Sequence, residues 1–166
     1  MSTNFQNQDS PFSASGRFGR LSFLAWNFLL IIFTLGANLV SYKFLIRNFS
    51  LNLLITYNVI ILLVVLIIYF IFSIKRLHDR NQTGWLSLLN IIPIISTFFY
   101  VYLIVSPGTG GQNNFGFPRK THSLEKILAW IFIPLLCIAT ILSILALPQI
   151  IKNFTMYYQL FDQIKN

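Results

Sequence analysis

Most side chains that could do chemistry lie in one short gap between two uncharged stretches of the sequence. The segment KRLHDRNQTGW covers 75–85, and uncharged runs at 51–74 and 85–105 flank it. His78 and Asp79 are neighbours there, and a histidine beside a carboxylate suggests general acid–base catalysis. Adjacent residues on a helix point about 100° apart, however, and an orienting carboxylate usually comes from elsewhere in the fold. We therefore expect a structural or electrostatic role for this pair.

The rest of the sequence gives little support to an enzyme. The patterns G-x-S-x-G and H-E-x-x-H do not occur, and one thiol, that of Cys137, does not make a metal site. We predict that the protein is not an enzyme and uses no metal or other cofactor. An opposing hypothesis is a membrane-embedded enzyme that uses His78. It requires a polar pocket within hydrogen-bond reach of the imidazole ring.

Asp79 is the only acid inside this basic cluster. Arg76 precedes it by three residues, and Arg17 and Arg20 are also three apart, so each pair would share a helix face. We expect Asp79 to form an ion pair with Arg76 or with Arg17 and Arg20. The alternative is that all of these arginines contact lipid phosphates, because basic residues beside a membrane commonly bind headgroups.

Composition places the chain in a membrane. Of its 166 residues, 55% are hydrophobic and only 10% charged, and the mean hydropathy is +0.69. A soluble domain would have about a quarter of its residues charged. About 20 apolar residues cross the hydrocarbon core as a helix, and four uncharged runs are long enough: 23–42, 51–74, 85–105 and 127–151. We predict an all-α polytopic membrane protein, a bundle of four transmembrane helices.

The chain divides into three parts by composition. Residues 1–15 are rich in Ser, Asn and Gln and predict a flexible polar N-terminal tail. Residues 16–118 predict a membrane domain with three transmembrane helices, the third of them kinked by Pro93. Residues 119–166 predict a fourth transmembrane helix followed by an amphipathic C-terminal tail.

The net charge of +8 points to anionic lipid headgroups as partners rather than nucleic acid, because the basic residues lie at the ends of apolar runs. With four crossings, one face carries both termini and the 75–84 loop, with seven of the twelve lysines and arginines. The positive-inside rule then places both termini in the cytoplasm. Trp85, at the start of the third run, is typical of an interfacial aromatic belt.

A glycine-rich segment, PGTGGQNNFGFP at 107–118, is a loop by composition. Such loops can present backbone amides to an anion, but Gly-Lys-Ser/Thr of a P-loop is missing. We favour a compact structural turn built by Gly108, Gly111, Asn113 and Gly116.

The four predicted spans contain no Asp, Glu, Lys, Arg or His, which argues against an ion-coupled transporter. Their polar residues include Asn27, Asn38, Asn58 and Asn90. We expect these amides to bond between helices.

Three motifs together resemble one family, catalogued as domain of unknown function 805. They are GRFGRLSF at 16–23, KRLHDRNQTGW at 75–85 and PGTGGQNNFG at 107–116, and the resemblance covers about 12–118. Lys75 and Thr83 depart from the family pattern, where Arg and Ser are usual. The resemblance implies a small bacterial inner-membrane protein and carries no enzymatic activity or cofactor.

Taken together, these features predict a non-enzymatic lipid- or protein-binding module of the bacterial inner membrane. Its partners would be anionic lipid headgroups, with a membrane-protein partner or a second copy of the chain as further possibilities. The residues that would carry binding or ion pairing are Arg17, Arg20, Arg76, His78, Asp79 and Trp85. The alternative is a small transporter or channel subunit, which would have to oligomerise because four helices enclose little lumen.

Overall fold

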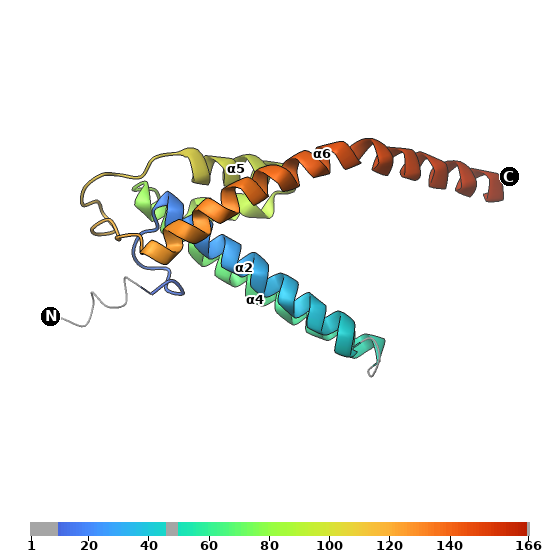
Figure 1. The fold of residues 1–166 in the computed structure, drawn as a ribbon, viewed down its shortest axis with the longest axis horizontal. Coiled ribbons are helices and arrows are strands. Elements are labelled where there is room, and N and C mark those ends of the chain that lie inside the picture. The colour runs from blue at the N-terminus through green and yellow to red at the C-terminus, as the bar shows by residue number, and fades with distance from the viewer. Residues whose placement is uncertain (1–9, 46–49, 166) are drawn as a thin grey trace. The chain divides into compact units, whose positions relative to one another are not determined.

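The computed structural model describes residues 10–45 and 50–165, and these are mostly helical (Figure 1). The predicted tail at 1–15 therefore lies mostly outside the described residues. In the described part no strand forms, only one isolated bridge between Asn113 and Gly116, so the all-α prediction is confirmed. The elements are α2 (Arg20–Val40), the π-helical turn η1 (Ser41–Leu45), α4 (Leu51–Asp79), the 3-10 helix η2 (Gly84–Ile91), α5 (Pro93–Val105) and α6 (Ser123–Lys165).

Three of these helices are long and apolar enough to cross a membrane within the described part of the chain. The candidate spans are Arg20–Lys43, Leu51–Asp79 and Ser123–Met156. At 1.5 Å per residue, even the shortest spans about 36 Å, which exceeds a hydrocarbon core of about 30 Å. The first, second and fourth predicted spans therefore have helical counterparts.

The third predicted span, 85–105, is not one helix. It consists of the 3-10 helix η2 and the 13-residue α5, and α5 would extend only about 20 Å. Pro93 causes the break: its ring drives Ile92 into an extended conformation (φ −88°, ψ 111°), and its missing N–H suits the first turn of α5. The prediction of one kinked transmembrane helix is wrong, and the predicted count of four is not supported.

Instead, η2 and α5 form a hairpin that returns to the end of α4. Near its open end, the Tyr102 hydroxyl donates to Gln82 Oε1 at 3.0 Å, and the Thr109 N–H donates to the Asp79 carbonyl at 2.8 Å. Near its tip, the Tyr69 hydroxyl donates to Asn90 Oδ1 at 3.0 Å. Tyr69 lies ten residues before Asp79 in α4, so the tip is about 15 Å from the open end. That depth is about half of the hydrocarbon core.

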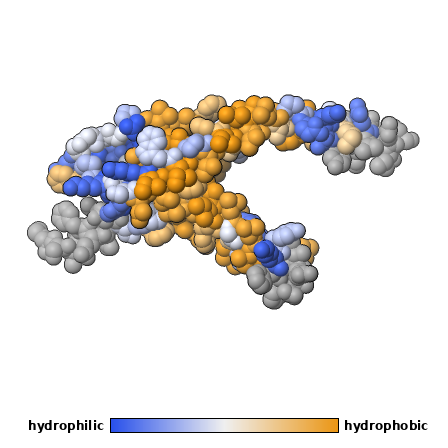
Figure 2. Space-filling view, in the orientation of Figure 1, coloured by the Kyte–Doolittle hydropathy of each residue, from blue (hydrophilic) through white to orange (hydrophobic). Residues whose placement is uncertain are grey.

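The chain separates into two units, Met1–Ala129 and Trp130–Asn166. The core of the first unit lies where α2 begins and α4 and α5 end. It is formed by buried Phe18, Phe23, Phe72, Leu77 and Leu103, and the rings of Phe18 and Phe72 are 5.7 Å apart. Farther along α2 and α4, large apolar side chains are exposed, as lipid-facing positions require (Figure 2).

The second unit is the continuation of α6. It contains Pro134 and Pro148 within the helix, and its side chains from Ile138 to Ile151 are exposed and largely apolar. Cys137 is exposed and free. This unit provides most of the third candidate span.

Candidate functional site

Asp79 lies between two buried arginines and pairs with both. Oδ1 accepts from Nε and Nη2 of Arg17 at 3.1 and 3.0 Å, and Oδ2 accepts from Nη1 of Arg76 at 2.5 Å. Both guanidinium groups are fully buried, and the Asp79 side chain is 8% exposed. One carboxylate therefore offsets part of the charge of two cations. Arg20, the other predicted partner of Asp79, is exposed and lies outside this centre.

Arg17 also donates hydrogen bonds to backbone carbonyls of the glycine-rich loop. Its Nη1 donates to the carbonyls of Gly111 and Gly116 at 2.7 and 3.0 Å, and its Nη2 donates to the Thr109 carbonyl at 2.5 Å. The loop therefore presents acceptors to a cation in the chain rather than amides to an external anion. Because guanidinium N–H groups form a rigid fork, Arg17 fixes several carbonyls at once.

Arg76 performs the same task for the hairpin. Its Nε donates to the Leu103 carbonyl at 2.7 Å, its Nη1 to the Phe18 carbonyl at 3.2 Å, and its Nη2 to the Ser106 carbonyl. These carbonyls include the end of α5, which would otherwise lack partners. The two arginines thus join the segment before α2, the end of α4, the end of α5 and the loop that follows.

Two glycines of the loop are required by this geometry. A Cβ at Gly108 would overlap the carboxylate of Asp79, and Gly116 has φ of 104°, which side chains rarely adopt. Asn113 closes the turn by exchanging backbone hydrogen bonds with Gly116, and its amide donates to the His78 carbonyl at 2.8 Å. Gly108, Gly111, Asn113 and Gly116 therefore all belong to the shell around Arg17 and Asp79.

A second carboxylate centre, around Glu125, was missed at the level of sequence. Arg119 pairs with Glu125 at 2.9 Å (Nη2 to Oε1), and Trp26 Nε1 and Ser22 Oγ donate to the carboxylate at 2.8 and 3.0 Å. The His122 N–H also donates to it at 3.1 Å, so Glu125 caps the start of its own helix. The run T-H-S-L-E at 121–125 signals this cap, but nothing in it signals the partners on α2.

This contact overturns part of the predicted topology. Four crossings place Arg119 and Arg20 on opposite membrane faces, yet Arg119 and Glu125 contact the first turns of α2. The hairpin explains the difference, because it enters and leaves at the same end. Both carboxylate centres consequently lie at the end of the first unit where α2 begins.

A family model, described as protein of unknown function (DUF805), matches residues 11–117. The chain belongs to this family. The predicted resemblance over about 12–118 is therefore confirmed. The inner membrane proteins YhaH of Escherichia coli K12 and of Escherichia coli O157:H7 are each 38% identical over 42 residues. That match covers 25% of this chain and 35% of each relative, so it spans about a third of their length. No solved structure matches the chain.

The DUF805 match contains the Asp79 centre completely, with Arg17, Arg76 and the loop through Gly116. Arg119 and Glu125 lie beyond its last residue. The family match, together with three apolar helices, makes this a membrane protein. Within the described residues no group of three or more His, Cys, Asp or Glu side chains lies together.

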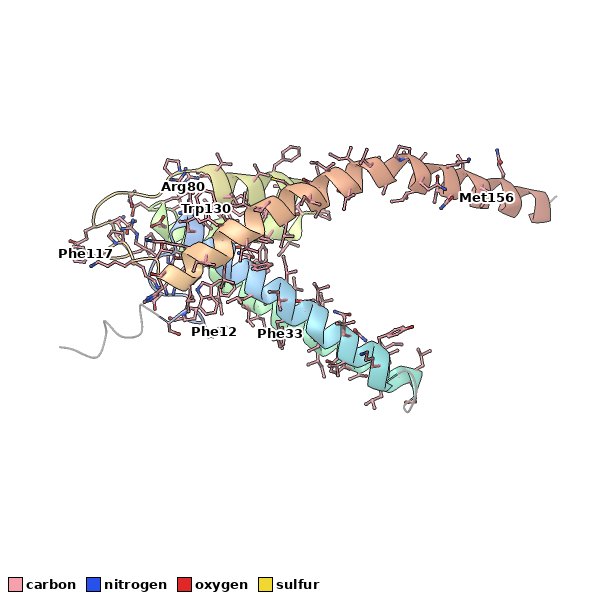
Figure 3. The ribbon with its side chains drawn as sticks, in the orientation of Figure 1. Phe12, Phe33, Arg80, Phe117, Trp130 and Met156 are labelled. Atoms are coloured by element: carbon pink, nitrogen blue, oxygen red, sulfur yellow. The ribbon has the colours of Figure 1, made fainter. Side chains whose placement is uncertain are left out.

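Four further residues of the 75–85 motif are His78, Lys75, Trp85 and Arg80. The His78 ring stacks on Phe115, with centroids 3.8 Å apart, and Lys75 lies over the ring of Phe18 at 4.5 Å. Trp85 is 78% exposed at the start of η2, as expected for a side chain at the membrane surface. Arg80 lies against the ring of Tyr102 at 4.0 Å (labelled in Figure 3).

The asparagines in the apolar runs divide into two kinds. Asn58 donates to Ser41 Oγ at 3.1 Å, and Asn90 accepts from Tyr69, so these two bond between elements as predicted. Asn27 and Asn38 instead donate to carbonyls four residues earlier in α2, those of Phe23 and Thr34. All four amides thus have partners in the protein.

Proposed function

We propose that this protein is a non-enzymatic integral module of the bacterial inner membrane that binds anionic lipid headgroups at its charged end. One observation carries the proposal: the buried arginines are held by Asp79 and carbonyl groups, whereas Arg20, Lys120 and Lys126 are exposed. We call these three residues the basic rim. The proposal moves headgroup binding from Arg17 and Arg76 to the rim, and the inner-membrane location rests on the YhaH relatives.

The rim residues come from two neighbouring segments. A Cβ at Gly19 would lie 3.6 Å from Thr121 Oγ1, and Ser22 Oγ lies 3.2 Å from the same atom. The first turn of α2, which carries Arg20, is therefore beside the segment that carries Lys120 and Lys126. Basic residues at a membrane surface contribute about 1 kcal/mol each to binding of anionic lipid.

The rim also supports an orientation. The end of the first unit where α2 begins carries eight of the twelve lysines and arginines: Arg17, Arg20, Lys75, Arg76, Arg80, Arg119, Lys120 and Lys126. The positive-inside rule assigns such an end to the cytoplasm. Because three crossings leave a chain's ends on opposite faces, we propose a C-terminal segment outside the cytoplasm, in place of two cytoplasmic termini.

Lipid binding is tested on purified protein in detergent by counting bound phosphatidylglycerol and phosphatidylcholine with native mass spectrometry. Replacing the three rim cations with Gln (Arg20→Gln, Lys120→Gln, Lys126→Gln) should weaken phosphatidylglycerol binding by on the order of a hundredfold. Lys43→Gln, a matched exposed cation at the other end of α2, should leave it nearly unchanged. Equal binding of both lipids, or equal loss in both variants, would refute the proposal.

Orientation is tested in spheroplasts with a membrane-impermeant maleimide. On a Cys137→Ser background, Asn153→Cys should react without permeabilisation, and Gln112→Cys should react only after it, since both positions are exposed in the structure. Protection of both cysteines in intact spheroplasts would restore the cytoplasmic assignment of both termini.

A further inference from the structure

A groove of about 520 Å³ lies between α4 and η2, the first arm of the hairpin. Its walls come from the last three turns of α4, the turn at Thr83 and Gly84, the 3-10 helix η2, and Phe115 of the glycine-rich loop. Neither the Asp79 centre nor the basic rim uses this space.

The groove is polar at one end and apolar at the other. His78 and Thr83 lie at the end nearest Asp79, and the Ser87 hydroxyl lies one turn into η2. Phe70 and Ile74 line it eight and four residues before His78 on α4, which is about 12 and 6 Å deeper along the helix. This gradient follows the polarity of a membrane leaflet, with the polar end at the surface.

The lining contains no Lys, Arg, Asp or Glu side chain within the described part of the chain. An anionic group in the groove would therefore lose hydration without gaining an opposite charge, which is costly. The polar atoms that are present instead suit a hydroxyl or ester group. Ser87 is 3% exposed and lines the groove, and a serine hydroxyl can both donate and accept a hydrogen bond.

Gly84 leaves space in the groove that a side chain would fill. A Cβ there would lie 3.0 Å from Ile74 Cγ2 and 3.5 Å from His78 Nε2. The imidazole edge that carries Nε2 therefore faces Gly84, while the ring face is covered by Phe115. The histidine contributes a polar edge to a groove whose other walls are largely aromatic and aliphatic.

We propose that this groove binds an uncharged amphiphile of the diacylglycerol class. Its hydroxyl and ester groups contact His78 and Ser87, and one hydrocarbon chain extends toward Phe70. The site differs from the basic rim in selectivity, because the rim selects negative charge and the groove excludes it. The protein thus has two lipid sites at one end, and the groove is independent of the proposed function of the rim.

The test uses photoreactive lipids on the full chain in native membranes. A diazirine-bearing diacylglycerol should label peptides that contain residues 70–88, and a diazirine-bearing phosphatidylglycerol should label them at least about tenfold less. Leu88→Trp fills the groove and should reduce diacylglycerol labelling at least about tenfold. Leu86→Trp is the control, because Leu86 is a comparably exposed leucine of η2 (36% against 48%) that does not line the groove.

Ser87→Ala gives a second measurement that does not depend on the bulk of tryptophan. Loss of one hydrogen bond of about 1 kcal/mol should lower diacylglycerol labelling about fivefold and leave phosphatidylglycerol binding at the rim unchanged. The proposal is overturned if both probes label the segment equally, if Leu86→Trp acts like Leu88→Trp, or if Ser87→Ala leaves labelling unchanged.

Discussion

Asp79 and Glu125 are two buried carboxylates at the same end of the first unit, and they are satisfied in different ways. Asp79 faces two fully buried guanidinium groups, which together also donate to seven backbone carbonyls, four from Arg17 and three from Arg76. Glu125 faces one, that of Arg119, and otherwise accepts from a hydroxyl, an indole and a backbone N–H. The first centre joins four chain segments, whereas the second joins α2 to the start of α6.

The difference shows what each centre does for the fold. Removing the charge of Asp79 leaves two cations buried without a counter-ion, so the centre depends on that one group. Removing the charge of Glu125 leaves one cation beside neutral partners that an amide can partly satisfy. We therefore expect the hairpin and the glycine-rich loop to be far more sensitive to their acid than the start of α6 is to its own.

Asp79→Asn should have the largest effect. Loss of one partner of a buried ion pair costs about 3–5 kcal/mol, because the remaining charge is uncompensated. Thermal unfolding of the purified protein in detergent should show a strongly lowered Tm and early proteolysis of the 106–118 loop. An unchanged Tm would show that carbonyl groups alone hold both arginines, and the contrast with Glu125 would disappear.

Gly108→Ala should come next, because its Cβ would overlap the Asp79 carboxylate. Overpacking of this kind costs about 1–3 kcal/mol. The control is Gly110→Ala, two residues away, where a Cβ meets no atom within 4 Å. Chemical denaturation in detergent should separate the two variants, and equal stability would mean that the loop does not approach Asp79 as the structure has it.

Glu125→Gln should be milder than Asp79→Asn. The amide keeps an acceptor for Trp26, but the Arg119 pair and the helix cap weaken, for a loss of about 1–2 kcal/mol. The substitution should also change the surroundings of the Trp26 indole, and tryptophan fluorescence measures that change. A loss as large as that of Asp79→Asn would make the two centres equivalent and remove the distinction between them.

Arg20→Gln should have the smallest effect on stability, within about 0.5 kcal/mol, because Arg20 is exposed outside both centres. Arg17→Gln, three residues earlier, should by comparison destabilise the protein strongly, because it removes one of the two guanidinium groups that pair with Asp79. Equal effects in a Tm series would show that Arg20 has a structural partner in the folded protein.

Several features of the site were readable from residue types. Asp79 is the only acid among these basic residues, which favoured an ion pair with Arg76 or with Arg17 and Arg20 beside the alternative of lipid contacts. Arg17 and Arg76 share it. The compact turn at 107–118 was also predicted from its glycines, and Gly116 has the positive φ, 104°, that such a turn uses. The Glu125 centre was not readable, because its partners on α2 lie about 100 positions away in the chain.

The sequence by itself determined that the surroundings are lipid, where the three long helices lie, and the family. Uncharged runs of 20 residues or more require internally bonded backbone in lipid, and three spaced motifs specify DUF805. Only the tertiary structure decided the direction of residues 84–105, because hydropathy records a preference for apolar surroundings and not whether a segment crosses or returns. Pro93 marked the break, but long-range contacts, Thr109 with Asp79 and Tyr69 with Asn90, make it a hairpin.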